Sequence, residues 1–104
     1  MSGQGFVARV VTWEGTAHVN ICDEELLGTK VQDGSLEMQI SRDYFGGELI
    51  SSDEAVQLVR SCAVANLVGR RIVHRVLAEK LAAPGAVRTI GDVAFLMIFK
   101  FTGS

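Results

Sequence analysis

Residues 51–82 have the sequence SSDEAVQLVRSCAVANLVGRRIVHRVLAEKLA, and this stretch decides the expected fold. Its first residues have the spacing of a capping box, in which Ser51 and Glu54 each bond the other's backbone N–H. Apolar residues then recur at helical spacing, which predicts one helix over Asp53–Ala65 and a second over Arg70–Ala82. A Pro-Gly pair follows the second helix and ends it.

Strands are predicted on both sides of the two helices, because apolar and polar residues alternate there. They cover Phe6–Trp13, Thr16–Cys22, Ser35–Ser41, Ala86–Ile90 and Val93–Phe101. The last strand is apolar on both sides and is therefore expected away from the sheet edges. The order β-β-β-α-α-β-β predicts an α+β two-layer sandwich, with two helices packed on one face of a largely antiparallel sheet. The residues expected in its core include Leu36, Met38, Ile40, Val59, Val76, Leu77 and Phe95.

Composition favours one domain over residues 1–104, since 48% of the residues are apolar and 21% are charged. The formal charge of −2 excludes a generally basic nucleic-acid binder, but not a local basic face. Cys22 and Cys62 are too few for a disulfide framework, which favours reduced thiols and a cytoplasmic location. No signal peptide is recognised, and the longest apolar run, Val93–Phe99, is too short to span a bilayer, so no membrane association is expected.

Charge is unevenly distributed along the chain. Residues 14–54 contain ten acidic and two basic residues, whereas residues 60–88 contain six basic residues and one acidic residue. A molecule with an acidic side and a basic side is therefore expected. Helical spacing gathers several basic residues on the polar side of the second helix, where they need no internal partner and could contact phosphates, although a solvated helix face is an equally weighted interpretation. This basic stripe consists of Arg70, Arg71, His74, Arg75 and Lys80.

Two further features are candidates for binding. The loop Tyr44-Phe45-Gly46-Gly47 offers close backbone approach to a ligand, although a tight turn is favoured over a ligand site. His18 and Cys22 share one side of a strand next to acidic residues, but a zinc site needs more ligands at recognisable spacing. We therefore predict no metal and no cofactor. Cys62 is expected in the core, and no pattern of nucleophile and base predicts catalysis.

Three segments carry a resemblance to a known family. They are Cys22–Gly28, Tyr44–Ile50 and Ala65–Gly69, and with them nearly the whole chain is similar to the archaeal family called domain of unknown function 424. The resemblance implies an archaeal cytosolic protein with a two-layer α+β fold and no established activity. It also implies a Pro-His pair near the start of the last strand in many members, where this chain has Asp92-Val93-Ala94-Phe95. Chemistry that depends on that histidine is therefore not expected here.

Three functions remain open at this point. The favoured hypothesis is a non-catalytic RNA-binding or ribosome-associated accessory protein, linked to translation, that docks the basic stripe onto phosphates. The second is a protein interaction module or a homodimer in which an acidic half meets a basic half. The third is a small-molecule or metal-binding protein that uses the Gly46-Gly47 loop.

Overall fold

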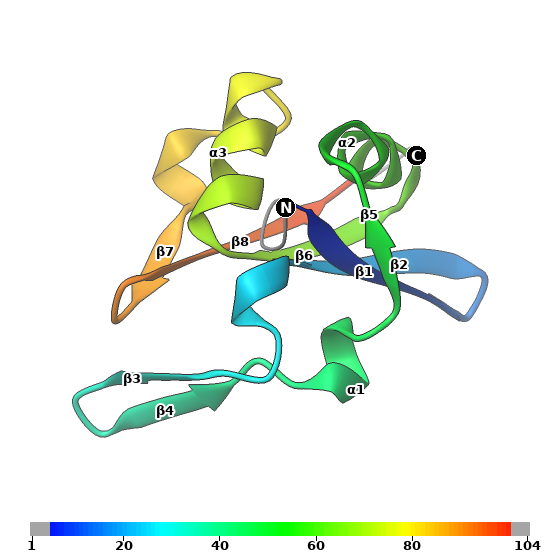
Figure 1. Cartoon of the computed structure of the whole chain (residues 1–104). Helices are drawn as coiled ribbons and strands as arrows, with labels where there is room; N and C mark the ends of the chain where they lie inside the picture. The colour runs from blue at the N-terminus through cyan, green and yellow to red at the C-terminus, as the bar shows by residue number, and fades with distance from the viewer. Residues whose placement is uncertain (1–4, 101–104) are drawn as a thin grey trace.

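The computed structural model describes residues 5–100 and is built on the β1–β2 hairpin (Figure 1). β1 (Phe6–Trp13) and β2 (Thr16–Asp23) pair antiparallel over their whole length. The predicted turn between them places Glu14 and Gly15 at φ values of 51° and 76°, which match the right-handed twist of the two strands.

Four more strands extend the hairpin into a six-stranded sheet. Neighbouring strands are antiparallel except β2 and β6, which run parallel. The spatial order is β5 (Glu48–Ile50), β1, β2, β6 (Val64–Val68), β8 (Val93–Phe99) and β7 (Arg88–Ile90).

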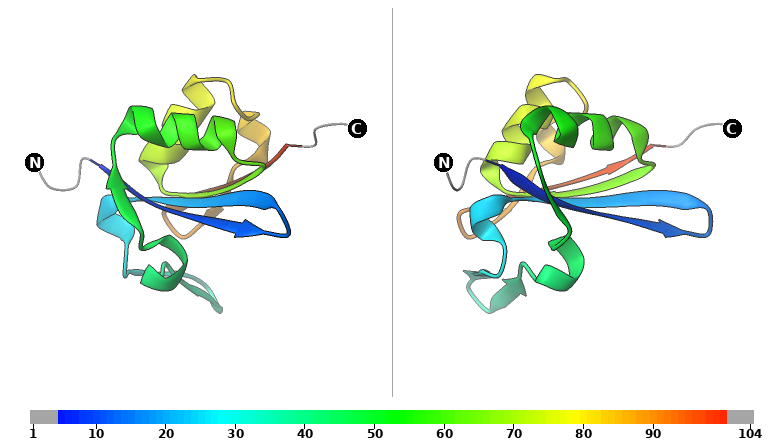
Figure 2. Two further views of the ribbon diagram at one scale, coloured as in Figure 1. Left: turned by 90° about the vertical axis from the view of Figure 1, so that its right-hand side faces the viewer. Right: turned by 45° about the vertical axis from the view of Figure 1, so that its right-hand side comes forward.

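Two helices cross over the same face of this sheet (Figure 2). α2 (Ser52–Ser61) connects β5 to β6. α3 (Arg70–Ala78) follows β6, and the short 3₁₀ turn η2 (Pro84–Ala86) then leads from α3 to β7. β5, β6 and β7 run in the same direction, and both connections cross the sheet from the β5 edge towards the β7 edge. Because connections of this kind are right-handed, both helices lie on the same face. The predicted capping box starts α2: Ser51 Oγ accepts the Glu54 N–H at 3.1 Å, and Glu54 Oε1 accepts the Ser51 N–H at 2.9 Å.

The apolar side chains form two clusters, one on each side of the sheet. The larger lies between the sheet and the two helices and includes the fully buried Val19, Val59 and Val76. The smaller lies on the opposite face, around Cys22 and Phe45. It is covered by η1 (Glu24–Leu26), the hairpin β3 (Lys30–Asp33) with β4 (Leu36–Gln39), and α1 (Arg42–Phe45).

The α+β fold class is confirmed, as are the mostly antiparallel sheet and the two helices on one face. β8 lies between β6 and β7, so the predicted interior position is also confirmed. The end of its predicted range, Phe101, lies outside the described residues. The order of elements agrees in outline, with β3, β5, β6 and the short α1 in addition.

The boundary of the first helix is wrong. α2 ends at Ser61, Cys62 has an extended backbone, and residues 64–68 form β6. A short apolar run does not distinguish a buried strand from a buried helix, and here pairing with β2 and β8 decides for the strand. α3 also ends earlier than predicted, at Ala78.

Part of the predicted core is wrong as well. Leu36 is 53% exposed and Met38 is 40% exposed, because β4 pairs only with β3 in a hairpin that stands away from the main sheet. Ile40 is buried as predicted, whereas Leu77 and Phe95 are half-buried beside the two clusters.

Candidate functional site

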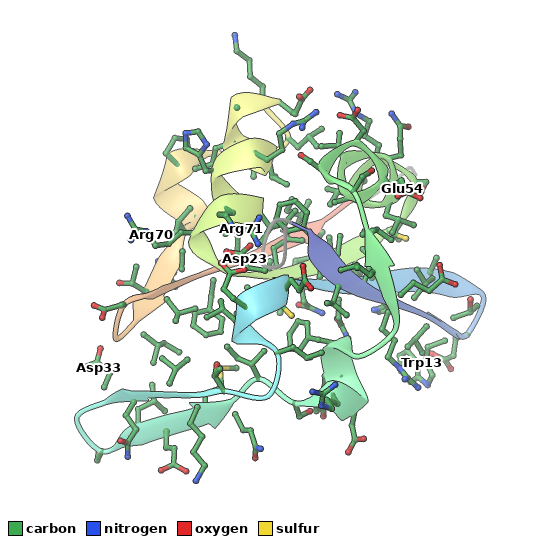
Figure 3. All side chains as sticks on the ribbon, viewed as in Figure 1. Trp13, Asp23, Asp33, Glu54, Arg70 and Arg71 are labelled. Atoms are coloured by element: carbon green, nitrogen blue, oxygen red, sulfur yellow. The ribbon has the colours of Figure 1, made fainter. Side chains whose placement is uncertain are left out.

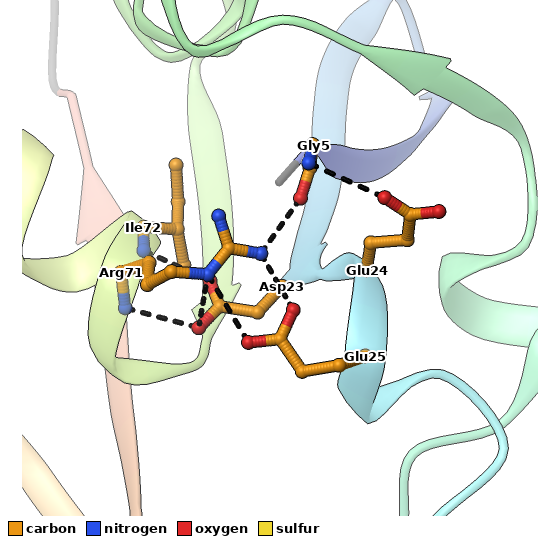
Figure 4. A network of polar contacts seen from close by, with 6 residues as sticks. All are labelled: Gly5, Asp23, Glu24, Glu25, Arg71 and Ile72. Atoms are coloured by element: carbon orange, nitrogen blue, oxygen red, sulfur yellow. Dashed lines mark hydrogen bonds and ion pairs between the residues drawn. The ribbon is translucent and has the colours of Figure 1, made fainter. Parts of the chain in front are cut away.

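A buried carboxylate holds the first turn of α3 (Figure 4). Asp23, at the end of β2, is 2% exposed, and its Oδ2 and Oδ1 accept the backbone N–H groups of Arg71 and Ile72 at 3.0 and 2.9 Å. The Asp23 carboxylate thereby accepts the first free N–H groups of α3. This role is usually taken by the side chain of the N-cap residue, which here is Gly69. Burial raises the pKa of the Asp23 carboxyl, and the two N–H donors and the Arg71 guanidinium oppose this shift.

Gly69 is what allows this contact. Its φ is 124°, and a Cβ on it would overlap the Asp23 carboxyl group. Any other residue at this position would strain the backbone and displace the capping carboxylate.

The Arg71 side chain is bound within the molecule. Its Nε and Nη2 donate to Glu25 at 3.1 and 2.6 Å, Nη2 also donates to the Gly5 carbonyl at 2.8 Å, and the guanidinium lies 4.8 Å from the centre of the Phe6 ring. The bidentate pairing lowers the pKa of Glu25 and raises that of Arg71. Arg71 therefore ties β1, η1 and α3 together.

Arg75 is bound in a similar way. Its guanidinium donates to Asp53 at 2.9 Å and to Glu79 at 3.0 Å, and it also bonds the Ser52 hydroxyl. These hydrogen bonds raise the pKa of Arg75. The prediction that Arg71 and Arg75 need no internal partner is wrong. The acidic and basic halves of the sequence meet inside one molecule, so the expected separation of charge is partly cancelled.

Three members of the basic stripe remain exposed: Arg70, His74 and Lys80. In Figure 3, Arg70 and Arg71 leave the first turn of α3 in different directions, and Arg70 points away from the network around Asp23. Arg70 also lines a cavity of about 240 Å³, which it shares with Asp92 near the start of β8 and with the network residues Asp23, Glu25 and Arg71. Nucleic-acid binding by the basic stripe stays a prediction. Fewer of its side chains are available for phosphates than predicted, because Arg71 and Arg75 are bound within the molecule.

The glycine loop allows close backbone packing. Gly47 lies against the Ala8 carbonyl of β1, Gly46 lies against a carbonyl of α1, and Phe45 is buried in the smaller cluster. These contacts explain the two glycines without a ligand. Tyr44 differs from the rest of the segment, because it is 67% exposed.

An exposed surface with both apolar and polar side chains lies on the face of the sheet opposite α2 and α3. Neighbouring strands bring side chains together there in two rows, Val11–His18–Val64–Phe99 and Arg9–Asn20–Asn66–Met97, with Trp13 at one end. The smaller cluster covers the next row, around Cys22, but leaves these two rows uncovered. We call this surface the open face and define it by Arg9, Val11, Trp13, His18, Asn20, Val64, Asn66, Met97 and Phe99.

A depression of about 420 Å³ lies on the open face and is bordered by Tyr44 of α1. Trp13, at its other side, is 65% exposed and meets the His18 ring edge-on at a centroid distance of 6.5 Å. Between them, Asn66 Nδ2 donates to Asn20 Oδ1 at 2.8 Å, and Asn20 Nδ2 donates to the Tyr44 carbonyl at 3.0 Å. This ladder fixes both amides, and within residues 5–100 no hydrogen bond engages the Asn66 Oδ1.

This surface is difficult to predict from the sequence. The aromatic residues are far apart in the chain, and Asn66 directly follows the helix predicted over Asp53–Ala65. Only the parallel pairing of β6 with β2 brings Asn66 beside Asn20. The alternation of β1 and β2 could have indicated that Arg9, Trp13 and His18 share one face.

Cys22 is not a reactive thiol. It is fully buried in the smaller cluster, and burial raises its pKa to about 12. Cys62 is buried as expected, and burial raises the pKa of its thiol also. In the part of the chain that the structure describes, no three His, Cys, Asp or Glu side chains gather as a metal site would require. No helix among the described residues is long and apolar enough to cross a membrane.

Comparison with known proteins identifies the family. The family described as "Protein of unknown function (DUF424)" matches residues 11–101. The chain belongs to this family. A crystal structure described as that of an uncharacterized conserved protein from Methanopyrus kandleri is similar with a TM-score of 0.81, over 96% of each chain and at 18% identity, which shows a shared fold. No curated protein matches the chain.

The three segments that carry the resemblance to the DUF424 family have structural roles in this chain. Cys22–Gly28 supplies Asp23 and Glu25, and Ala65–Gly69 supplies the glycine that the Asp23 carboxylate requires. Tyr44–Ile50 packs α1 and β5 against β1. The same segments also contribute Tyr44 and Asn66 to the depression on the open face.

Proposed function

We propose that this member of the DUF424 family is a non-catalytic RNA-binding protein that holds a single-stranded segment on the open face. The observation that carries the proposal is the depression in which the exposed rings of Trp13 and Tyr44 flank two fixed amides. Its volume of about 420 Å³ is in the range of small ligand sites. Sheet surfaces that carry exposed aromatic residues bind unstacked bases by stacking.

Each part of the depression has a place in this function. The Trp13 and Tyr44 rings offer stacking surfaces for bases, and the Asn66 Oδ1 can accept a hydrogen bond from a base amino group. Arg9 is exposed at the same surface and uses one N–H at 3.4 Å on the Gly46 carbonyl, which leaves further donors for a phosphate. The open face therefore combines stacking, base-edge and backbone contacts.

The charge of the chain predicts how this binding depends on salt. The net charge is −2, and Arg71 and Arg75 are engaged inside the molecule. Stacking of bases on the aromatic rings should therefore contribute more to the affinity than the release of counterions from the phosphates. For a single strand, each phosphate contact contributes about 0.7 to the slope of log affinity against log salt. Arg9→Gln should lower the slope by about that amount.

The proposal is tested by the fluorescence anisotropy of a labelled single-stranded RNA of mixed sequence. The double variant Trp13→Ala/Tyr44→Ala removes both stacking rings. Since each stacked base contributes ~1–3 kcal/mol, the variant should weaken RNA binding at least ~30-fold. Both side chains are exposed, so the fold should tolerate their loss. An RNA duplex of the same sequence should compete poorly, because its bases are already stacked.

The matched control removes the remaining basic stripe. Arg70→Gln/His74→Gln/Lys80→Gln changes three exposed side chains, two on α3 and one just after its end, and leaves the open face intact. It should bind RNA within a few-fold of the native affinity. Loss of binding in this variant but not in Trp13→Ala/Tyr44→Ala would place the RNA on α3, and absence of binding to any RNA would refute the proposed function.

A protein ligand on the same surface is the second candidate. Met97 and Phe99 are neighbours on this face of β8 and are 53% and 55% exposed, which favours a protein ligand because exposed apolar side chains that lie close together mark interaction surfaces. Isolation of the protein from its own cell extract with and without nuclease separates the candidates. Partners that survive nuclease treatment and molar salt would favour the protein ligand.

A further inference from the structure

Two exposed apolar side chains of β8 form a part of the open face that the depression does not include. Met97 and Phe99 are each more than half exposed, and they lie on the same side of the sheet as their β6 partners Asn66 and Val64. Neither residue lines the depression, whose walls come from β1, β2, β6 and α1. We call Met97 and Phe99 the β8 shelf.

The β8 shelf begins where the depression ends. Asn66 lines the depression, and its antiparallel partner Met97 lies on the next strand, so their Cα atoms are about 5 Å apart. Among residues 5–100, the elements that cover this face of the sheet pack around Cys22 and leave Met97 exposed. A ligand in the depression can therefore extend across β6 onto the shelf.

The surroundings of the depression favour one course for a bound strand. Tyr44 of α1 borders the depression, and the smaller cluster covers the neighbouring row of side chains around Cys22. The two rows of the open face run across the strands, from β1 to β8. A single strand that occupies the depression therefore follows these rows across the sheet, towards β8.

The length of this course follows from the strand spacing. Phe99 and Val11 belong to one row and are three strand spacings apart, and Trp13 lies two residues beyond Val11. With about 4.8 Å between strands and about 3.4 Å per residue, the Cα atoms of Trp13 and Phe99 are about 16 Å apart. Neighbouring nucleotides of a helical strand rise only about 3.4 Å. A dinucleotide bound at Trp13 therefore does not reach the shelf.

We propose that the β8 shelf is a second stacking site for the same RNA, so that the open face binds a segment of about four nucleotides, the size of the smallest single-strand sites of OB folds. This inference rests on the proposed function of the open face. The Phe99 ring supplies a stacking surface, and the Met97 thioether is a polarisable contact for an aromatic base.

The dependence of binding on RNA length tests the inference. Quenching of Trp13 emission gives the affinity for oligoribonucleotides of two, four, six and eight nucleotides. The affinity should rise at least ~10-fold from two to four nucleotides and change little beyond that length. Phe99→Ala should weaken binding of the six-nucleotide RNA at least ~5-fold and leave dinucleotide binding unchanged, because only the longer RNA reaches the shelf.

Leu49→Ala is the matched control. Leu49 is an apolar residue of similar exposure on β5, four strand positions from β8, and its loss should leave the affinity for every length unchanged. Met97→Ala is the second variant and decides if Phe99→Ala does not fold. It should weaken binding of the six-nucleotide RNA at least ~2-fold and, again, leave the dinucleotide unaffected.

The outcomes separate this inference from the proposed function. Absence of binding at every length would refute the proposed function itself. Binding that is equal in the native chain, Phe99→Ala and Met97→Ala at every length would overturn the second stacking site and leave the proposed function in place. An equal loss for all lengths, the dinucleotide included, would overturn it too, because a dinucleotide at Trp13 does not contact the shelf.

Discussion

Removal of the Asp23 carboxylate should destabilise the protein more than removal of any other single acidic side chain described above. In Asp23→Ala, the buried N–H of Ile72 loses its acceptor, which costs about 1–3 kcal/mol. The N–H of Arg71 loses its acceptor too, and the helix loses a negative charge at its N-terminus, which together contribute about 1 kcal/mol. The expected loss is therefore about 2–4 kcal/mol.

Chemical denaturation followed by far-UV circular dichroism measures this loss. A decrease of 2–4 kcal/mol is a large part of the 5–15 kcal/mol that stabilises a typical domain, so the midpoint should fall clearly while the slope stays the same. Asp33→Ala is the matched control. It removes the same charge from an exposed site with a single hydrogen bond of 3.3 Å to Gly91, and it should cost less than about 1 kcal/mol.

Equal destabilisation by Asp23→Ala and Asp33→Ala would refute the reasoning. So would a loss below about 0.5 kcal/mol for Asp23→Ala, since the Ile72 N–H is fully buried and water could not replace the carboxylate without a structural change.

Two further predictions concern the same network. Gly69→Ala should lower the free energy of unfolding by more than about 1 kcal/mol in the native chain, because the added methyl group meets the Asp23 carboxyl group. The loss should be smaller in the Asp23→Ala background. Denaturation of the single and double variants tests this, and additive losses would contradict it. Glu25→Gln should reduce stability by about 0.5–1 kcal/mol at neutral pH, a small value because the pair with Arg71 is partly exposed. Pairing lowers the pKa of Glu25, so its contribution is present above the ordinary value of about 4.3 and is lost as the pH falls through the lower folded value. The difference in stability between native and Glu25→Gln protein should therefore shrink as the pH falls below the ordinary value, and a difference that stays constant through acid pH would show that the charge of Glu25 does not matter.

Local signals in the sequence predicted the elements that local interactions determine. The capping box at Ser51 and Glu54 sets the start of α2, and the Glu14-Gly15 turn sets the register of β1 and β2. β6 was missed because its apolar run fits either a helix or a buried strand, and only pairing with β2 and β8 distinguishes them.

The polar side chains show the same limit more strongly. Helical spacing correctly placed Arg71 and Arg75 on α3, but their partners Glu25 and Asp53 come from other elements. Spacing along one helix carries no information about a carboxylate that approaches from η1 or α2. The open face was missed for the same reason, since its rows run across four strands.

The fluorescence of Trp13 tests the central claim most directly, because it is the only tryptophan in the chain and borders the proposed site. Titration with single-stranded RNA should quench its emission, since a base stacks on the exposed indole, and the quenching curve should give the same affinity as anisotropy of the labelled RNA. Unchanged Trp13 emission at RNA concentrations that saturate the anisotropy signal would show that RNA binds away from the open face and would contradict the account.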